Sequence, residues 1–249
     1  MTPRKTMVRL RDTDYPFWYL PGGNIREALR KVFSGEEYPP LWYLPHARIE
    51  TIADVGAHQG AASLWFHSQY PTARILSFEP LPDNVALLER NTRDIAAITV
   101  HPFGLSAGDG EGPMFTGRAQ TMQASLYPSS ESGRVRRTVR VRDARTVLRE
   151  SGLEHLSILK VDTEGSEVPI LERVLPDWGD RIGALYLEWH TEEDRLTFDA
   201  MLRDRFLVVS MRATEPHRGS VCYLAKCWAD AVPGFHAHAV RRPLPAHRS

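Results

Sequence analysis

A glycine-containing turn between an apolar strand and a helix constrains the fold more than any other feature. It reads Asp54-Val55-Gly56-Ala57-His58-Gln59-Gly60 and ends the apolar run 49–55. Gly56 allows a sharp turn and close approach of a ligand to the backbone, and the next helix offers unpaired N–H groups. The spacing differs from the G-x-G-x-x-G dinucleotide fingerprint. The turn therefore indicates a ligand site of another kind or, alternatively, a tight strand–helix turn without a ligand.

Strand-like and helix-like segments alternate on both sides of an irregular middle region, 103–142. Strands are predicted at 49–55, 73–78, 97–101, 156–161, 182–187, 206–211 and 221–225. Helices are predicted at 61–70, 83–91, 143–151, 168–175 and 192–203. The middle region contains one alternating, half-exposed strand toward its end, at 134–142. This alternation is typical of a mostly parallel sheet covered by helices on both faces.

Three parts of the chain follow from this order. The N-terminal segment 1–48 is expected to be helical and extended, to pack on the core and to open its helix with a capping box at Asn24 and Glu27. The main α/β domain covers 49–228, and 229–249 form a C-terminal tail. A chain of 249 residues suits one such domain.

Composition restricts the partners and the compartment. Lysine plus arginine and aspartate plus glutamate both total 31, so no global field favours nucleic acid or an anionic membrane. Two cysteines suit a reducing compartment better than a disulfide framework. Neither an apolar run long enough to span a membrane nor a signal peptide is expected. The sequence therefore predicts a cytoplasmic protein without nucleic-acid or membrane partners.

An apolar surface for contact between copies of the chain is a further prediction. The aromatic side chains Trp18, Tyr19, Trp42 and Tyr43 could form it. A homo-oligomer is therefore among the expected states.

Acidic residues at the first two strand ends indicate a nucleotide-like ligand. Glu79 ends the strand after the glycine-containing turn and would lie beside that turn, where a carboxylate can accept hydrogen bonds from both hydroxyls of a ribose. The alternative for Glu79 is a solvated strand end. Asp54 ends an apolar strand, where a carboxylate is costly unless it is paired. Lys160, inside another apolar strand, is expected to pair with an acidic neighbour.

Three blocks of sequence resemble the FkbM family of S-adenosylmethionine-dependent methyltransferases. They are 52–60, Phe78-Glu79-Pro80 with Asn84 and Asn91, and the run Leu159-Lys160-Val161-Asp162-Thr163-Glu164-Gly165-Ser166-Glu167. The segments 104–106 and 186–190 are also similar to the family, and the resemblance covers 49–226. It implies an α/β class I methyltransferase fold, Rossmann-like and doubly wound, with a mostly parallel seven-stranded sheet whose last strand is antiparallel.

The resemblance also implies S-adenosylmethionine as the methyl donor. Asp54, Gly56 and Gly60 would line its methionine part, Glu79 would hold the ribose, and 103–106 would lie near the adenine. The full implied set for the cofactor is Asp54, Gly56, His58, Gly60, Glu79, Pro80, Phe103, Gly104, Ser106 and Asp162. His58 stands where the family commonly has asparagine.

The acceptor implied by the resemblance is a hydroxyl of a small molecule, either a sugar or a natural-product intermediate. The alternatives are methylation of nitrogen or a carboxylate, a macromolecular acceptor, and a non-catalytic protein that keeps the fold. An arginine-rich stretch, 134–145, is either a solvated strand face or a recognition site for an acidic acceptor.

Polar residues at the next two strand ends carry the expected chemistry. Because ligands bind outside the carboxyl ends of strands in open α/β sheets, the same crevice should hold Asp162, Glu164, Glu188 and His190. His190, Asp162 or Glu164 could be the general base that removes the proton of the acceptor. A second hypothesis is Mg²⁺ held by Asp162 and Glu188. For His190 the alternative is a partly buried, hydrogen-bonded histidine without a catalytic role.

Overall fold

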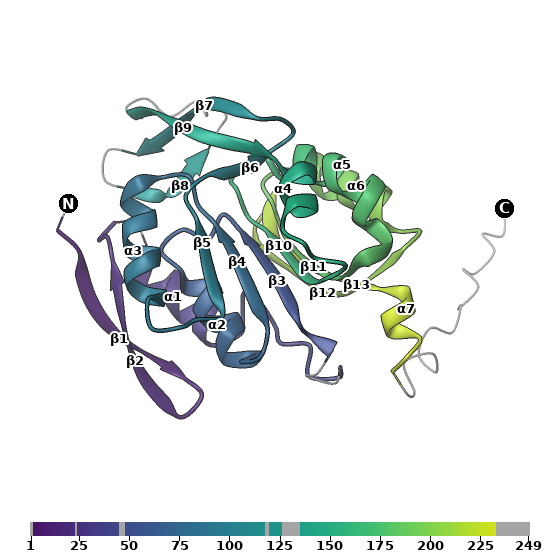
Figure 1. The fold of residues 1–249 in the computed structure, drawn as a ribbon, viewed down its shortest axis with the longest axis horizontal. Helices are drawn as coiled ribbons and strands as arrows, with labels where there is room; N and C mark the ends of the chain where they lie inside the picture. The colour runs from purple at the N-terminus through teal and green to yellow at the C-terminus, as the bar shows by residue number, and fades with distance from the viewer. Residues whose placement is uncertain (1, 23, 45–47, 118–119, 126–134, 233–249) are drawn as a thin grey trace, which may run out of the picture.

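A seven-stranded sheet forms the centre of the computed structural model, which describes residues 2–22, 24–44, 48–117, 120–125 and 135–232 (Figure 1). The strands lie in the order β12-β13-β11-β10-β3-β4-β5. Their bounds are β3 Thr51–Val55, β4 Arg74–Phe78, β5 Ile98–His101, β10 Leu156–Val161, β11 Ile182–Trp189, β12 Phe206–Glu215 and β13 Arg218–Ala225. The last strand, β13, is antiparallel to both of its neighbours, and the other pairs are parallel. The predicted class I methyltransferase sheet is therefore confirmed.

Apolar side chains on both faces of the inner strands hold the sheet in place. In β3 and β10, Ile52 and Ile158 belong to the core on one face, whereas Ala53 and Leu159 belong to the core on the other. Successive side chains of a strand point to opposite faces, so continuous apolar runs such as those of β3 and β10 fit burial on both sides. The parallel register also brings the carboxyl ends of β3, β4, β10 and β11 to one edge of the sheet.

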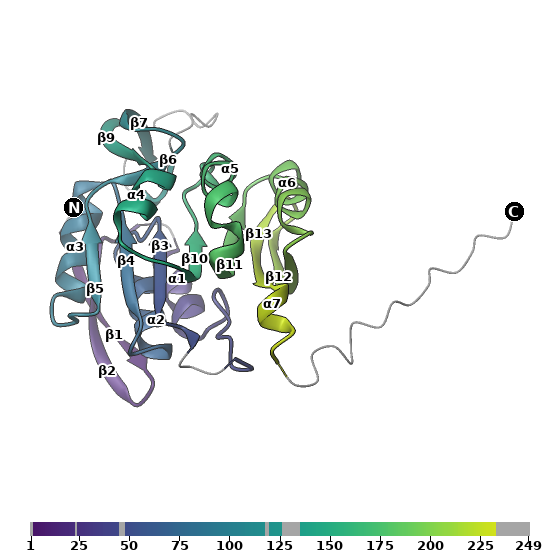
Figure 2. The same cartoon turned by 45° about the vertical axis from the view of Figure 1, so that its right-hand side comes forward.

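Helices cover the two faces of the sheet. In Figure 2, α4, α5 and α6 lie on one face, and α1 and α2 lie on the other. Their bounds are α1 Ile25–Phe33, α2 Ala61–Gln69, α3 Pro82–Thr92, α4 Ala144–Glu150, α5 Glu167–Trp178, α6 Glu192–Leu202 and α7 Lys226–Ala229. The helix predicted to stop before Pro176 continues to Trp178, whose side chain is buried in the core. Within the described part of the chain, no helix is long and apolar enough to cross a membrane.

The middle region forms a second sheet of four strands, of which the sequence predicted only one. The order is β6-β9-β7-β8, with bounds β6 Gly104–Ser106, β7 Gly110–Gly117, β8 Gln120–Ser125 and β9 Val135–Asp143. The strand β9 is the predicted alternating strand, and it pairs with both β6 and β7. In Figure 1 this second sheet lies above the central sheet, and β6 directly follows β5 in the chain.

The N-terminal segment contains a hairpin that the sequence did not predict. Its strands are β1 Arg4–Leu10 and β2 Thr13–Tyr19, which are antiparallel. The expected capping box at Asn24 is wrong: the backbone there has φ −96° and ψ 35°, and the side chain makes no capping hydrogen bond. An N-cap side chain needs an extended backbone to reach the first turn.

Only part of the aromatic contact surface that the sequence predicted is exposed. Trp42 is 80% exposed, but Tyr19 is buried and cannot contribute to the expected contact surface. A homo-oligomer stays a prediction.

Two predicted segments lie partly outside the described residues. Of the predicted tail, these are residues 233–249, and of the predicted strand 134–142, this is Arg134.

Candidate functional site

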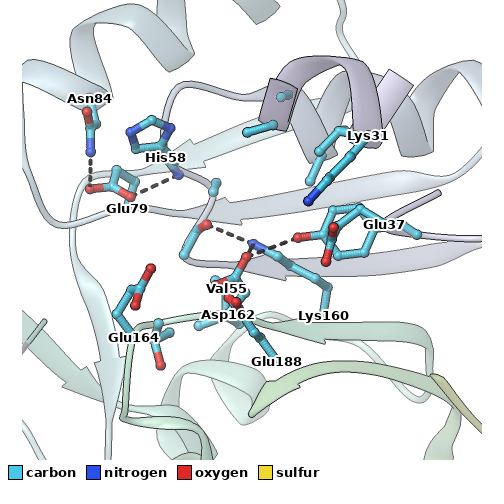
Figure 3. Close-up of a pocket in the computed structure, with 18 of the residues that line it drawn as sticks. Lys31, Glu37, Val55, His58, Glu79, Asn84, Lys160, Asp162, Glu164 and Glu188 are labelled. Carbon is cyan, nitrogen blue, oxygen red and sulfur yellow. Dashed lines mark hydrogen bonds and ion pairs between the residues drawn. The ribbon is translucent and has the colours of Figure 1, made fainter. Parts of the chain in front are cut away.

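A cavity of about 420 Å³ lies at the carboxyl ends of the parallel strands (Figure 3). It is bounded by α1, by the turn after β3, by Glu79 and Pro80 directly after β4, and by residues from β10, β11 and β13. The structure brings eight predicted site residues to its wall, namely Gly56, His58, Glu79, Pro80, Gly104, Asp162, Glu164 and Glu188. The residues lining it do not include the predicted Asp54, Gly60, Phe103, Ser106 and His190. The crevice expected from the strand ends therefore exists, with a smaller set of residues.

Glu79 is fixed in the cavity wall by three donors. Its Oε1 accepts hydrogen bonds from the Leu81 N–H at 2.9 Å and from Asn84 Nδ2 at 3.2 Å, and its Oε2 accepts from the His58 N–H at 2.9 Å. The residue is only 4% exposed, so the alternative of a solvated strand end is wrong. Burial raises the pKa of Glu79, and the three donors oppose that shift. A carboxylate has about four acceptor positions, so Glu79 keeps capacity for a ligand hydroxyl.

The two glycines of the turn serve the protein backbone first. Gly56 has φ +78°, and a Cβ atom there would lie 1.9 Å from the carbonyl oxygen of Asp162. Gly60 has φ +92°, and a Cβ atom would meet Leu88 Cδ1 at 2.8 Å. Left-handed backbone and tight packing both require glycine. Gly56 also lines the cavity, whereas a direct role of Gly60 in ligand binding stays a prediction.

His58 lies between the two glycines of the turn and also has a positive φ, 50°. Burial lowers the pKa of His58 to about 4, so its ring is neutral at pH 7. The wall of the cavity on this side is therefore uncharged apart from Glu79.

Asp54 and Lys160 form a buried ion pair, so the acidic neighbour that the sequence predicted for Lys160 without naming it is Asp54. Lys160 Nζ lies 3.0 Å from Asp54 Oδ1, and the two side chains are 2% and 0% exposed. The ammonium group also donates to the carbonyl oxygen of Gly56 at 2.8 Å. Burial lowers the pKa of Lys160, but the charges of Asp54 and Asp162 outweigh burial and raise it. Asp54 thus holds the glycine turn through Lys160, and direct contact with a ligand stays a prediction.

Asp162 and Glu188 form a carboxyl pair in the wall opposite Glu79. Tyr38 donates its hydroxyl hydrogen to Asp162 Oδ2 at 3.0 Å, and the two carboxyl groups share a hydrogen bond. Burial and the charge of Asp162 raise the pKa of Glu188 well above its usual range. Burial opposes ionisation of Asp162, but Lys160 and the hydrogen bond from Glu188 hold its pKa well below the usual range. The pKa values of the two carboxyl groups therefore shift in opposite directions.

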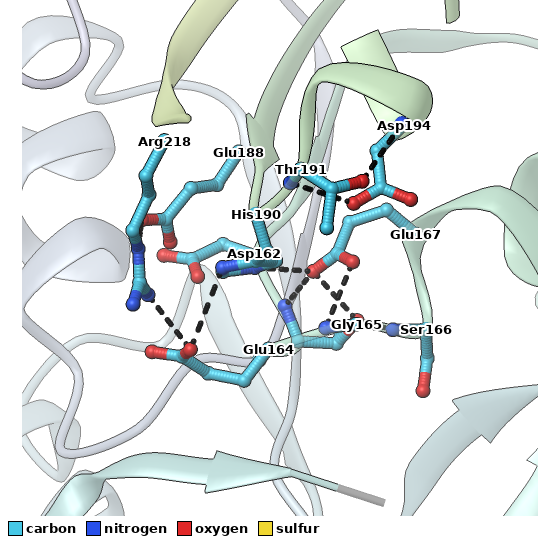
Figure 4. Close-up of polar contacts among 12 residues, drawn as sticks. Asp162, Glu164, Gly165, Ser166, Glu167, Glu188, His190, Thr191, Asp194 and Arg218 are labelled. Atoms are coloured by element: carbon cyan, nitrogen blue, oxygen red, sulfur yellow. Dashed lines mark hydrogen bonds and ion pairs between the residues drawn. The ribbon is translucent and has the colours of Figure 1, made fainter. Parts of the chain in front are cut away.

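Arg218 of β13 links this pair to a third carboxylate (Figure 4). Its Nε donates to Glu188 Oε1 at 2.9 Å, and its Nη2 donates to Glu164 Oε2 at 2.7 Å. Burial raises the pKa of Glu164 above its ordinary value, although Arg218 opposes the shift. Sequence analysis missed Arg218 and Tyr38, because nothing in their local sequence shows that they reach the strand ends.

His190 does not line the cavity, which contradicts the expectation that it faces the crevice. Its Nε2 lies 3.4 Å from Glu167 Oε1, and its Nδ1 lies 3.6 Å from Glu164 Oε2. Burial lowers the pKa of His190, but the two carboxylates outweigh burial and raise it. The position matches the alternative of a partly buried, hydrogen-bonded histidine. Its catalytic role stays a prediction, now through Glu164.

Two residues predicted near the adenine lie behind the wall. Phe103 is buried against Phe78, with ring centroids 5.8 Å apart, and Ser106 pairs with Asp143 between β6 and β9. Their neighbours Gly104 and Leu105 line the cavity instead. Contact of Phe103 and Ser106 with a cofactor stays a prediction.

The Mg²⁺ hypothesis gains no support from the donor set. Among the described residues, no group of three or more His, Cys, Asp or Glu side chains could hold a metal ion. Asp162 and Glu188, the two predicted ligands, hydrogen-bond to each other. Cationic side chains of the protein already contact both carboxyl groups, since Lys160 Nζ lies 3.7 Å from Asp162 Oδ2 and Arg218 Nε donates to Glu188 Oε1.

The described part of the arginine-rich stretch forms ion pairs away from the cavity. Arg137 contacts Asp83 at 2.8 Å, and Arg142 contacts Glu150 at 2.9 Å. These contacts fit the solvated strand face, and recognition of an acidic acceptor there stays a prediction.

Comparison with known proteins matches the part of the chain that contains most of the strand ends around the cavity. Residues 54–214 match the family model described as the methyltransferase FkbM domain. Methyltransferase sdnD of Sordaria araneosa is 28% identical over 186 residues, which cover 62% of this chain and 72% of that protein. Methyltransferase 1 of Beauveria bassiana is 22% identical, and the match covers 55% of this chain and 63% of that protein.

Two further similarities involve larger proteins. The AMB antimetabolite synthetase AmbE of Pseudomonas aeruginosa is 27% identical over 74% of this chain, which spans 10% of that synthetase. The crystal structure of a methyltransferase FkbM from Methylobacillus flagellatus aligns with a TM-score of 0.49 and 17% identity. That alignment covers 71% of this chain and 44% of the other.

Proposed function

Because this chain belongs to the methyltransferase FkbM family, we propose that it transfers a methyl group from S-adenosylmethionine to a hydroxyl of a small molecule. The observation that carries the proposal is one cavity that holds a rigid carboxylate at Glu79 and a carboxyl cluster at Asp162, Glu164 and Glu188. When bound, S-adenosylmethionine supplies an activated methyl group on a sulfonium.

The residues on the Glu79 side fit the cofactor. Glu79 is buried, and its acceptor capacity is not exhausted by its three protein donors, which suits the paired hydroxyls of a ribose. The backbone of 56–58 lies beside it, and Pro80 and Gly104 continue the wall. The cavity volume, about 420 Å³, lies in the range of small-molecule sites.

The carboxyl cluster suits a neutral hydroxyl acceptor. Asp162 is ionised and can accept the hydrogen bond that orients the hydroxyl. Glu164 is the stronger base, because burial raises its pKa, and it receives the proton. His190 lies behind Glu164, with Nδ1 3.6 Å from Oε2, and stabilises the ionised carboxylate.

The size and position of the cavity favour a small acceptor. The helix α1 and the residues Glu37 and Tyr38 bound the cavity, which limits the space for a polymer. The similarity to a synthetase of an antimetabolite supports a natural-product intermediate.

The test has two stages. Titration calorimetry with S-adenosylhomocysteine should give saturable binding. Absence of binding would contradict the proposed function. Fractionated metabolite extracts are then incubated with S-adenosylmethionine carrying a labelled methyl group. The label should appear in an ether linkage. Label in an amine or an ester would contradict hydroxyl methylation while leaving cofactor binding intact.

A further inference from the structure

Two oppositely charged side chains, Lys31 and Glu37, line one end of the cavity without forming an ion pair with each other. They are neighbours, because the Glu37 N–H donates to the carbonyl oxygen of Lys31 at 3.1 Å. In Figure 3 both lie at the end of the cavity opposite Glu79. Both are half-buried, and in the part of the chain that the structure describes neither belongs to an ion pair. Partly buried charges are unfavourable without partners, so this arrangement requires an explanation.

The neighbouring arginines are already used by another carboxylate, that of Glu36. It pairs with Arg30 at 2.8 Å and also with Arg212. Glu37 instead accepts a hydrogen bond from the neutral hydroxyl of Ser220. Burial raises the pKa of Glu37, which shows that the ionised carboxylate is only partly compensated. A cationic group of a ligand would therefore find a partner at Glu37.

A continuous wall of polar groups connects the glycine turn beside the proposed ribose position with these two side chains. The Lys160 ammonium group donates to the Gly56 carbonyl oxygen at 2.8 Å and lies 3.7 Å from Asp162 Oδ2. The same oxygen of Asp162 accepts from the hydroxyl of Tyr38 at 3.0 Å, and Tyr38 directly follows Glu37 in the chain. A nucleoside bound at one end of this wall can therefore extend a substituent to the other end. In S-adenosylmethionine that substituent ends in an α-ammonium and an α-carboxylate group.

We infer that Lys31 binds the α-carboxylate and Glu37 binds the α-ammonium group of the bound cofactor. The inference rests on the proposed function, since it takes the cavity as the site of S-adenosylmethionine. It assigns recognition of the amino acid part to the N-terminal segment, which lies outside the matched residues 54–214. The sequence predicted Asp54, Gly56 and Gly60 around this part, and of these three only Gly56 lines the cavity.

Two ligands test the amino acid part separately from the nucleoside. S-adenosylhomocysteine carries the ammonium and carboxylate groups, whereas 5′-methylthioadenosine has the same nucleoside and a methyl group in their place. Lys31→Met and Glu37→Gln nearly keep the size of each side chain and remove its charge. Each variant should bind S-adenosylhomocysteine about 10-fold more weakly, as expected for loss of one charged hydrogen bond. Both variants should bind 5′-methylthioadenosine with the affinity of the wild type, as measured by titration calorimetry.

Glu36→Gln and Lys226→Met are the matched controls. Glu36 pairs with Arg30, and Lys226 Nζ donates to the carbonyl oxygen of Arg203 at 2.8 Å. Neither Glu36 nor Lys226 is among the residues that line the cavity. Both controls should bind both ligands with wild-type affinity. A weaker affinity of Glu36→Gln for S-adenosylhomocysteine, equal to that of Glu37→Gln, would show an effect of nearby charge without contact and would overturn the inference.

The comparison of the two ligands separates the remaining outcomes. Wild-type affinity for S-adenosylhomocysteine in either variant would overturn the assignment of that side chain. An equal loss of affinity for both ligands would also overturn the inference, because it would show a general change of the cavity. If the wild type binds neither ligand, the proposed function itself fails.

Discussion

Lys160 and Asp54 form an ion pair of 3.0 Å between the adjacent strands β10 and β3, directly beneath the glycine turn. Ser63 completes the arrangement, because its hydroxyl donates to Asp54 Oδ2 at 2.6 Å. The ammonium group reaches the carbonyl oxygen of Gly56 as well, so one buried side chain holds both the carboxylate and the turn. The turn that shapes the cavity therefore depends on a charge pair that no ligand needs to touch.

Removing one member of this pair should destabilise the protein strongly. Lys160→Met leaves the carboxylate of Asp54 buried without a counter-ion, which costs about 3–5 kcal/mol in the free energy of unfolding. The double variant Lys160→Met with Asp54→Leu should recover part of that loss, because neither charge remains. Equilibrium denaturation measures both. A loss below about 1 kcal/mol in the single variant would contradict the buried pair.

Glu164 should control turnover and its pH dependence. Glu164→Gln is expected to reduce kcat by about 10²- to 10⁴-fold, the range for loss of a general base, with little change in affinity for S-adenosylhomocysteine. Burial raises the pKa of Glu164, so turnover in the wild type should fall as the pH decreases through that raised value, where the carboxyl group becomes protonated. A pH–rate profile checks this limb. A profile that stays flat down to the ordinary pKa of a glutamate would exclude Glu164 as the base.

His190 should make stability depend on pH in the opposite sense. Its pKa is raised in the folded state, because Glu167 and Glu164 outweigh burial. The charged ring therefore stabilises the fold below the unfolded pKa of about 6.5, and this contribution disappears as the pH rises through the folded value. The difference in unfolding free energy between wild type and His190→Gln should be larger at acidic than at alkaline pH.

The exposed His155, which pairs with Glu50 at the surface, supplies the control for that measurement. His155→Gln should lower the unfolding free energy at acidic pH by much less than His190→Gln does, because exposed ion pairs contribute little. Equal losses in the two variants at acidic pH would contradict the special environment of His190.

Exhaustive chelation should leave methyl transfer unchanged. The two residues predicted as Mg²⁺ ligands, Asp162 and Glu188, hydrogen-bond to each other and contact Lys160 and Arg218, which already supply positive charge. Labelled methyl transfer is compared before and after dialysis against a chelator. Loss of transfer that returns on addition of Mg²⁺ would contradict the account of this carboxyl pair.

The strand ends were predictable from sequence because parallel register brings them together. The pairs Asp54–Lys160 and Val55–Phe78 lie directly across neighbouring strands. A carboxylate that follows one inner strand therefore lies near a carboxylate that follows the next. Glu79, Asp162, Glu164 and Glu188 reached the cavity wall for this reason.

Local rules failed where tertiary contacts decide the structure. The hairpin β1–β2 was missed because Pro16 argues against a strand and the turn contains Arg11, with φ 52°, in place of glycine. Contacts with α3 compensate, since the Trp18 N–H donates to Asn91 Oδ1 at 2.8 Å. His190 was misplaced for a similar reason, because its position depends on Glu167 from another element.

The most direct test of the central claim is the affinity of Glu79 variants for S-adenosylhomocysteine. Glu79→Ala removes the carboxylate that we assign to the ribose, so the dissociation constant measured by calorimetry should rise about 10- to 100-fold, as expected for charged hydrogen bonds. Glu150→Ala, which removes an exposed carboxylate on α4, is the control and should bind normally. Unchanged affinity in a folded Glu79→Ala protein would contradict the assignment of this cavity to the cofactor.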